Sequence, residues 1–125
     1  MITQKELRIG NWIKMTYGNH SFCTVQGIDT EFIYTDIVTF DYTEPDEFEP
    51  IELTEFWFLK LGFTSSEEKF DYFSRNKYRI FEKSNICFTI DQYGHLKCII
   101  YKHIKYVHQL QNLYFALTGL ELEKK

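Results

Sequence analysis

Acidic side chains are the most concentrated chemical groups in this sequence, and they crowd one short segment. They are Asp41, Glu44, Asp46, Glu47, Glu49, Glu52 and Glu55. Two neighbouring carboxylates can act as a general acid and a general base when an apolar pocket raises the pKa of one of them. The residues around these carboxylates do not have the pattern of such a pocket. The segment is therefore interpreted as an acidic surface, and no catalytic residue is assigned.

Patterns for nucleophilic, phosphate-binding and metal chemistry are missing from the sequence. No Gly-x-Ser-x-Gly turn occurs and the six glycines are isolated, so neither a hydrolase elbow nor a phosphate loop is expected. His103 and His108 are five residues apart, which on a helix points them in different directions. All four histidines are interpreted as surface or boundary residues. We expect a protein that is not an enzyme and that has no cofactor and no metal.

The charges are separated along the chain. Residues 29–59 contain ten Asp or Glu and no Lys or Arg, whereas residues 60–105 contain nine Lys or Arg and five Asp or Glu. An acidic surface repels the phosphates of nucleic acid, which disfavours nucleic acid as a partner, and it steers association with a basic protein. The leading hypothesis is a non-enzymatic protein that binds a partner protein with a basic surface. The candidate contacts are Asp41, Glu44, Asp46, Glu47 and Glu49, with Phe48 as an aromatic anchor.

Three alternatives explain the same sequence. The acidic segment can serve only to keep the protein soluble. A single-stranded nucleic acid can bind the later half, where Arg79, Phe81 and Lys97 are expected on one face of a sheet. A small ligand such as a nucleotide can occupy a cleft between two predicted antiparallel meanders, residues 1–44 and 69–101. Because aromatic residues make up 18% of the chain, exposed rings would also favour a homodimer.

Length and composition indicate one domain inside the cell. A chain of 125 residues has the usual size of a single domain with one core. No apolar run has the length of a signal peptide or of a membrane span. Cys23, Cys87 and Cys98 are odd in number and widely spaced, which predicts reduced thiols. We expect a cytoplasmic protein.

The first part of the chain, residues 1–44, predicts a three-stranded antiparallel meander of the SH3-like type. Its strands are expected at Trp12–Tyr17, Ser21–Ile28 and Glu31–Phe40, separated by turn residues. The alternation of the first strand places Trp12 on one face and Ile13 with Met15 on the other. A short helical turn at Thr3–Glu6 is expected to precede it.

A short helix is predicted within residues 54–62. Thr54 is in the N-cap position of a helix over Glu55–Leu61, and Leu53 with Phe58 has the spacing of a hydrophobic staple. Gly62 follows where a left-handed residue can end the helix.

A second antiparallel meander is predicted over residues 69–101. A three-residue loop, Gln92-Tyr93-Gly94, pairs Ile90 with Leu96 and Thr89 with Lys97, so that apolar residues meet apolar ones. The same register places Cys98 in the core and Cys87 on the opposite face.

The last element is an amphipathic helix within residues 105–118, expected to run from about Lys105 to Leu117. Its apolar stripe contains Val107, Leu110, Tyr114 and Leu117, and Gly119 ends it. Together these elements define an α+β fold.

Several segments are similar to a family of small uncharacterised proteins of phages, prophages and mobile elements of Bacteroidetes. They are ELRIGNW at residues 6–12, PIELTE at 50–55, LKLGF at 59–63 and YVHQLQNLYFALTG at 106–119. The resemblance implies an accessory protein that acts inside the bacterial host cell on a host or phage protein with a basic surface, for example as an inhibitor of a host defence nuclease. It assigns no residue a catalytic role.

Overall fold

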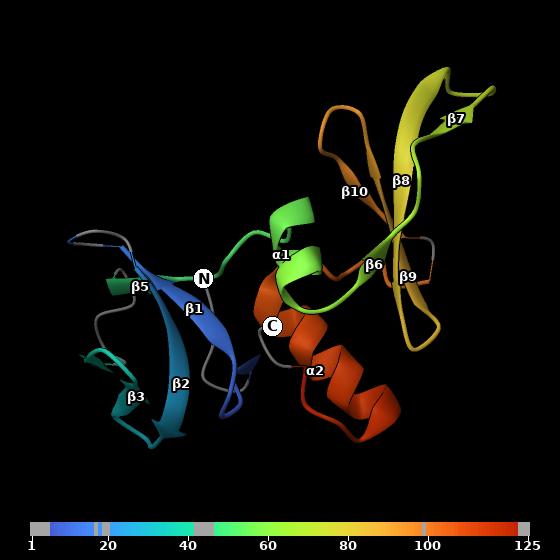
Figure 1. The fold of residues 1–125 in the computed structure, drawn as a ribbon. Coiled ribbons are helices and arrows are strands. Elements are labelled where there is room, and N and C mark those ends of the chain that lie inside the picture. The colour runs from blue at the N-terminus through green and yellow to red at the C-terminus, as the bar shows by residue number, and fades with distance from the viewer. Residues whose placement is uncertain (1–5, 17, 19–20, 42–46, 99, 123–125) are drawn as a thin grey trace. The chain divides into compact units, whose positions relative to one another are not determined.

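A computed structural model of the chain describes residues 6–16, 18, 21–41, 47–98 and 100–122 (Figure 1). The fold is α+β, with two antiparallel sheets of mostly short strands and a C-terminal helix. The chain forms two compact units. Unit 1 contains Met1–Glu52 and Tyr106–Glu121, and unit 2 contains Leu53–Lys105 and Leu122–Lys125. The single domain expected from the sequence stays a prediction.

Unit 1 is a five-stranded sheet with one helix. Its strands have the order β4-β3-β2-β1-β5, and each neighbouring pair is antiparallel. They are β1 (Trp12–Met15), β2 (Phe22–Ile28), β3 (Phe32–Thr35), β4 (Thr39–Asp41) and β5 (Phe48–Glu49), and the helix is α2 (Val107–Thr118).

The alternation predicted for the first strand is confirmed, because Ile13 and Met15 are buried in the core of unit 1. The core also contains rings from both edges of the sheet. Phe40 of β4 and Phe48 of β5 are in contact, with ring centroids 5.3 Å apart. The sheet is therefore curled, and its two edge strands share one core.

The prediction of one continuous third strand over Glu31–Phe40 is wrong. It is broken into β3 and β4 by a turn at residues 36–38. The Thr35 hydroxyl accepts hydrogen bonds from the amides of Ile37 and Val38, and the Asp36 carboxylate accepts one from the amide of Thr24. Side chains of this kind offer the backbone a local alternative to a strand, and alternation of apolar residues does not reveal it.

Helix α2 confirms the predicted C-terminal helix, with slightly different ends. Val107, Leu110 and Tyr114 are buried as expected, and Gly119 ends the helix with φ +74°. Leu117 is 53% exposed, so its place in the buried stripe is wrong. His108 and Gln111 are buried instead, and the buried face is thus more polar than the pattern of apolar residues predicts.

Unit 2 combines a short helix with the second meander. Its elements are α1 (Glu55–Lys60), β6 (Thr64–Ser65), β7 (Lys69–Asp71), β8 (Asn76–Lys83), β9 (Ile86–Asp91) and β10 (Leu96–Lys97). Strands β10, β9, β8 and β6 follow one another in the sheet, and β7 pairs with β8 as well.

The predicted helix is confirmed in α1, which begins at Glu55 as expected and ends at Lys60, one residue earlier than expected. Leu53 and Phe58 are both buried, and Gly62 has φ +84°. The Phe63 amide donates to the Phe58 carbonyl at 2.9 Å, which closes the helix end. The Phe58 ring stacks on Phe81 of β8, with ring centroids 5.1 Å apart. Aromatic packing between α1 and the sheet forms the core of unit 2.

The predicted β9–β10 register is confirmed. Ile90 pairs with Leu96, Thr89 pairs with Lys97, and Gly94 has φ +83°. The placement of Cys98 in the core is wrong, because this residue is only half-buried, beyond the end of β10.

Candidate functional site

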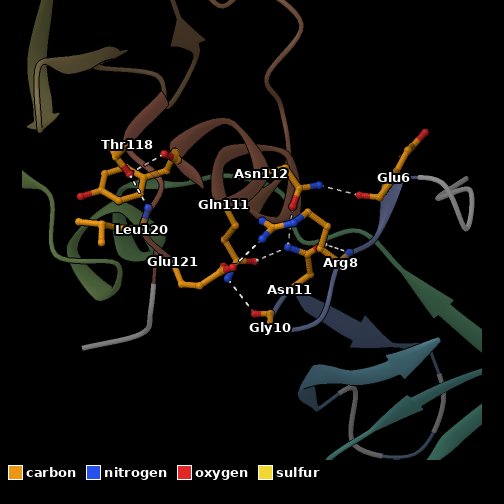
Figure 2. Close-up of polar contacts among 10 residues, drawn as sticks. Glu6, Arg8, Gly10, Asn11, Gln111, Asn112, Thr118, Leu120 and Glu121 are labelled. Carbon is orange, nitrogen blue, oxygen red and sulfur yellow. Dashed lines mark hydrogen bonds and ion pairs between the residues drawn. The ribbon is translucent and has the colours of Figure 1, made fainter. Parts of the chain in front are cut away.

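Residues 6–12 and 106–119, the first and last segments of the family resemblance, are in contact in unit 1. Figure 2 shows Asn11, Gln111 and Asn112 pointing toward one another. The side-chain oxygen of Gln111 accepts a hydrogen bond from the Trp12 backbone amide at 2.9 Å. The side-chain nitrogen of Gln111 donates one to the Gly10 carbonyl at 3.0 Å. Asn11 accepts the Arg8 amide at 2.7 Å and donates to Asn112 at 2.9 Å. Asn11 and Gln111 are 1% and 3% exposed, so they fasten α2 to the start of β1 and cannot reach a partner.

Charged groups complete this contact. The Arg8 guanidinium pairs with Glu121 at 2.5 Å and lies over the Phe115 ring, 3.9 Å from its centroid. His108 is completely buried, and its Nε2 lies 3.3 Å from the Glu6 carboxylate. Burial lowers the pKa of His108, and the nearby Glu6 opposes this shift. The interpretation of His108 as a surface or boundary residue is wrong, whereas His95 and His103 are exposed and His20 is outside the described residues.

The described candidate acidic contacts lie in or next to β4 and β5, the two edge strands of unit 1. Asp41 ends β4, while Glu47 precedes β5 and Glu49 belongs to it. Glu49 forms an exposed ion pair with Lys14 of β1 at 3.3 Å. Glu44 and Asp46 are outside the described residues.

Phe48 is not the exposed anchor that the sequence predicts. Its side chain is 5% exposed and belongs to the core of unit 1, where it contacts Phe40. In β5, alternation points Phe48 inward and Glu49 outward, and a ring in the core is not available to a partner.

A further acidic group lies at the β2–β3 turn. The Asp29 carboxylate accepts hydrogen bonds from the Tyr34 hydroxyl at 2.6 Å and from the Phe32 amide at 2.7 Å. These bonds, first of all the one from Tyr34, lower the pKa of Asp29. Because Phe32 pairs with Asp41, the carboxylates of Asp29, Glu31 and Asp41 belong to the same end of strands β3 and β4.

The separation of charge along the chain coincides with the division into units. Counted over the whole sequence, unit 1 has eleven Asp or Glu and three Lys or Arg, and unit 2 has seven Asp or Glu and eleven Lys or Arg. The formal charges are −8 and +4, which together give the net charge of −4. The two described cations of unit 1, Arg8 and Lys14, both pair with carboxylates of the same unit. Unit 1 therefore has a large excess of negative charge.

The three residues proposed for nucleic-acid binding do not share an exposed face. Phe81 is completely buried, because it pairs with Phe88 and contacts α1. Arg79 is exposed on the same side of β8 as Phe81, whereas Lys97 pairs with Thr89 on the other side of the sheet. The placement of Phe81 on an exposed face is thus wrong, since the β8–β9 register puts Phe81 and Phe88 on the same side.

A pocket of about 230 Å³ lies in unit 2, beside the first residue of α1. It is lined by Glu55, Glu68, Lys77, Tyr78, Arg79, Phe81, Ile90, Asp91 and Gln92. Its walls carry charges of both signs, and Phe81 with Ile90 supplies an apolar part. The pocket belongs to unit 2 alone, whereas the sequence analysis expected a cleft between the two meanders.

The most exposed aromatic group was missed by the sequence analysis. Phe70, Tyr72 and Phe73 at the β7–β8 turn are 45%, 83% and 101% exposed. The signal was present in the alternation of rings and cations in KFDYFSRNKYR, residues 69–79. It was read only as part of a strand.

The thiols and the possible metal ligands show no catalytic arrangement. Burial raises the pKa of the Cys23 thiol to about 11, which keeps it protonated. Cys87 and Cys98 are free thiols in unit 2. Among the described residues no three His, Cys, Asp or Glu side chains are grouped as a metal site requires. Within the same residues, none of the helices combines the length and hydropathy needed to cross a membrane.

Comparison with family models, with curated proteins and with solved structures found no match to this chain. The family resemblance described above stays a prediction.

Proposed function

We propose that this protein is a non-enzymatic binding protein whose acidic unit 1 docks on a partner protein with a basic surface. The observation that supports the proposal is that the excess of negative charge belongs to one of the two compact units. A formal charge of −8 belongs to one compact unit and +4 to the other. An excess of one sign on one unit produces a field that acts outward as a whole, and such a field raises association rates with an oppositely charged surface.

The contact residues of this proposal are Asp41, Glu47 and Glu49, with Glu31, which lies at the same end of strands β3 and β4 as Asp41. Buried Phe48 cannot anchor the partner. Tyr34 and Ile37 of the same unit are 39% and 50% exposed and take that role instead. The interface would then combine a charged rim with a few apolar contacts, which is common in protein complexes.

The partner class follows from the charge and from the family resemblance. Proteins that handle nucleic acid carry basic grooves, because they bind phosphates. The resemblance to phage and mobile-element proteins favours a host enzyme of this kind, such as a defence nuclease, in the bacterial cytoplasm. By occupying the basic groove, unit 1 would inhibit the enzyme without any chemistry of its own.

We also propose that the unit 1 sheet is an SH3-like barrel. The contact between Phe40 and Phe48 supports this, since it joins the two edge strands of the sheet through one core. A small barrel holds its turns in fixed positions, which suits a binding surface made of turn and edge residues.

Affinity capture from a bacterial host lysate tests the protein-binding proposal. The bait is the full chain, compared with a triple variant in which Asp41→Asn, Glu47→Gln and Glu49→Gln remove three negative charges of unit 1. We expect the native chain to retain a basic protein at about 0.15 M salt, where exposed charges still interact over roughly 8 Å. The triple variant should lose this protein, which mass spectrometry of the eluate measures.

The matched control removes three carboxylates of unit 2, through Glu67→Gln, Glu68→Gln and Glu82→Gln. This control should retain the partner, because it leaves the charge of unit 1 unchanged. Capture that survives in the unit 1 variant, with its fold intact by circular dichroism, would refute the proposal.

A further inference from the structure

The β7–β8 hairpin presents aromatic rings and cations together on the basic unit. Figure 1 shows its tip beyond the other strands of unit 2. We call Phe70, Tyr72, Phe73, Arg75 and Lys77 the hairpin patch. Its three rings are the exposed aromatic residues of this hairpin, and Phe73 is 101% exposed. A group of large rings exposed to water is typical of a binding surface.

The turn that carries these rings is held by its own hydrogen bonds. The Asp71 carboxylate accepts the Phe73 amide at 2.9 Å, and this bond is the first cause of the lowered pKa of Asp71. Arg75 has φ +57°, the left-handed conformation that returns the chain into β8. The rings of Phe70 and Tyr72 lie edge to face with centroids 4.9 Å apart. The patch is thus a built turn with a defined shape.

The strand register places rings and cations side by side. Phe70 of β7 pairs with Lys77 of β8, so their side chains share one face. Arg79 follows two residues later on that face, and its guanidinium donates to the Ser66 carbonyl at 3.3 Å. Beyond Arg79 the same face continues to the pocket in which Phe81 and Ile90 form the apolar part.

We propose that the hairpin patch binds single-stranded nucleic acid, with bases stacked on Phe70, Tyr72 and Phe73 and phosphates held by Arg75 and Lys77. Rings and cations that alternate on one surface are the features that such binding requires. The formal charge of +4 on unit 2 supports the attraction of a polyanion. A duplex fits less well, because its bases are already stacked and do not offer their faces.

Carboxylates near the hairpin patch should determine where the phosphates of a bound nucleic-acid strand lie. Glu55, Glu68 and Asp91 line the pocket and repel phosphate there. The phosphates should therefore follow Arg75 and Lys77 at the tip of the hairpin, while a base points toward the apolar part of the pocket. This inference concerns unit 2 and does not depend on the protein partner proposed for unit 1.

Fluorescence anisotropy tests the proposal. A labelled oligothymidine of twelve nucleotides is titrated with the full chain at 50 mM salt. Replacing Tyr72→Ala or Phe73→Ala should weaken binding about tenfold for each ring, since one stacked base contributes roughly that factor. Replacing Lys77→Gln should reduce the slope of log affinity against log salt by about 0.7, the value of one phosphate contact on a single strand.

Matched controls separate the patch from a general effect of surface residues. Phe22→Ala removes an exposed ring of unit 1, and Lys102→Gln removes an exposed cation outside the patch. Both should leave the affinity within about twofold of the native value.

Three results would overturn the proposal. They are the absence of an anisotropy change at 50 mM salt, equal affinities of the native chain and of both ring variants, and binding to anionic lipid vesicles with none to the oligomer. Equal affinities would mean that the chain attracts polyanions by charge alone. Vesicle binding would mean that the rings insert into a lipid surface.

Discussion

At the scale of single residues, a few buried polar side chains hold the contact between α2 and the start of β1. Asn11, His108 and Gln111 are the buried polar side chains of the described chain. The amide side chains accept hydrogen bonds from the backbone amides of Arg8 and Trp12 and donate one to the Gly10 carbonyl, before and at the start of β1. A buried amide with both of its groups bonded fixes geometry as well as stability, because only one arrangement satisfies it.

Replacing Gln111→Ala should lower the free energy of unfolding by about 2–3 kcal/mol. The change leaves the Gly10 carbonyl and the Trp12 amide without the bonds that they form to Gln111 at 3.0 and 2.9 Å. Each of these part-buried hydrogen bonds contributes about 0.5–1.5 kcal/mol, and truncation of the buried Gln111 side chain also removes its packing. Urea unfolding at pH 7 measures the loss. The matched control Gln26→Ala, at an exposed position of β2, should change stability by less than about 0.5 kcal/mol.

His108 should make stability depend on pH near neutrality. Burial lowers the pKa of His108 below its ordinary value of 6.5, so the folded state favours the neutral ring. The stabilisation is complete above pH 6.5, where the ring is neutral in both states. It is lost as the pH falls from 6.5 through the folded pKa, because only the unfolded chain takes up the proton there.

Thermal unfolding between pH 8 and pH 5 measures this effect. In the variant His108→Phe the decrease in Tm over that range should be smaller, since the ring no longer titrates. An unchanged decrease would show that the titration of His108 does not cause it.

At the scale of the elements, turns and helix ends decide where the chain changes direction. Asp29, Asp71 and Asp91 each accept backbone amide bonds at a hairpin turn. A carboxylate in this position favours a tight turn. These residues also supply negative charge, so the charge of a turn residue alone does not distinguish a structural role from a binding role.

The two ends of α1 should respond differently to mutation. Thr54 is the N-cap residue, but its side chain makes no capping hydrogen bond, so Thr54→Ala should change stability by less than about 0.5 kcal/mol. Gly62→Ala should cost about 1–2 kcal/mol, because φ at residue 62 is +84° and a side chain is strained there. Urea unfolding of both variants measures the difference. A larger loss for Thr54→Ala than for Gly62→Ala would contradict this assignment.

At the scale of the whole molecule, the division of charge between the units connects the two binding proposals. Unit 1, at −8, suits a basic protein, and unit 2, at +4, suits a polyanion. A protein with both surfaces could contact a nucleic-acid enzyme and its single-stranded substrate. The two proposals are tested separately, because the charge variants and the ring variants lie in different units.

The sequence by itself determined the elements whose signals are local. The helix ends at Gly62 and Gly119, the β9–β10 turn at Gly94 and the buried alternation of β1 were all predicted correctly, because each depends on neighbouring residues or on one strand pair. The charge separation could also be read from the sequence, since charge needs no structure to be counted.

Only the tertiary structure decided which side chains of the candidate sites are exposed. Phe48 and Phe81 lie in cores, while Phe70, Tyr72 and Phe73 are exposed, although Phe48 was predicted as an exposed anchor and the other four belong to one predicted meander. Exposure depends on the face to which each strand points and on what covers that face. That information comes from contacts between elements, such as the β8–β9 register that pairs Phe81 with Phe88, the stacking of Phe58 on Phe81 and the ring contact of Phe40 with Phe48.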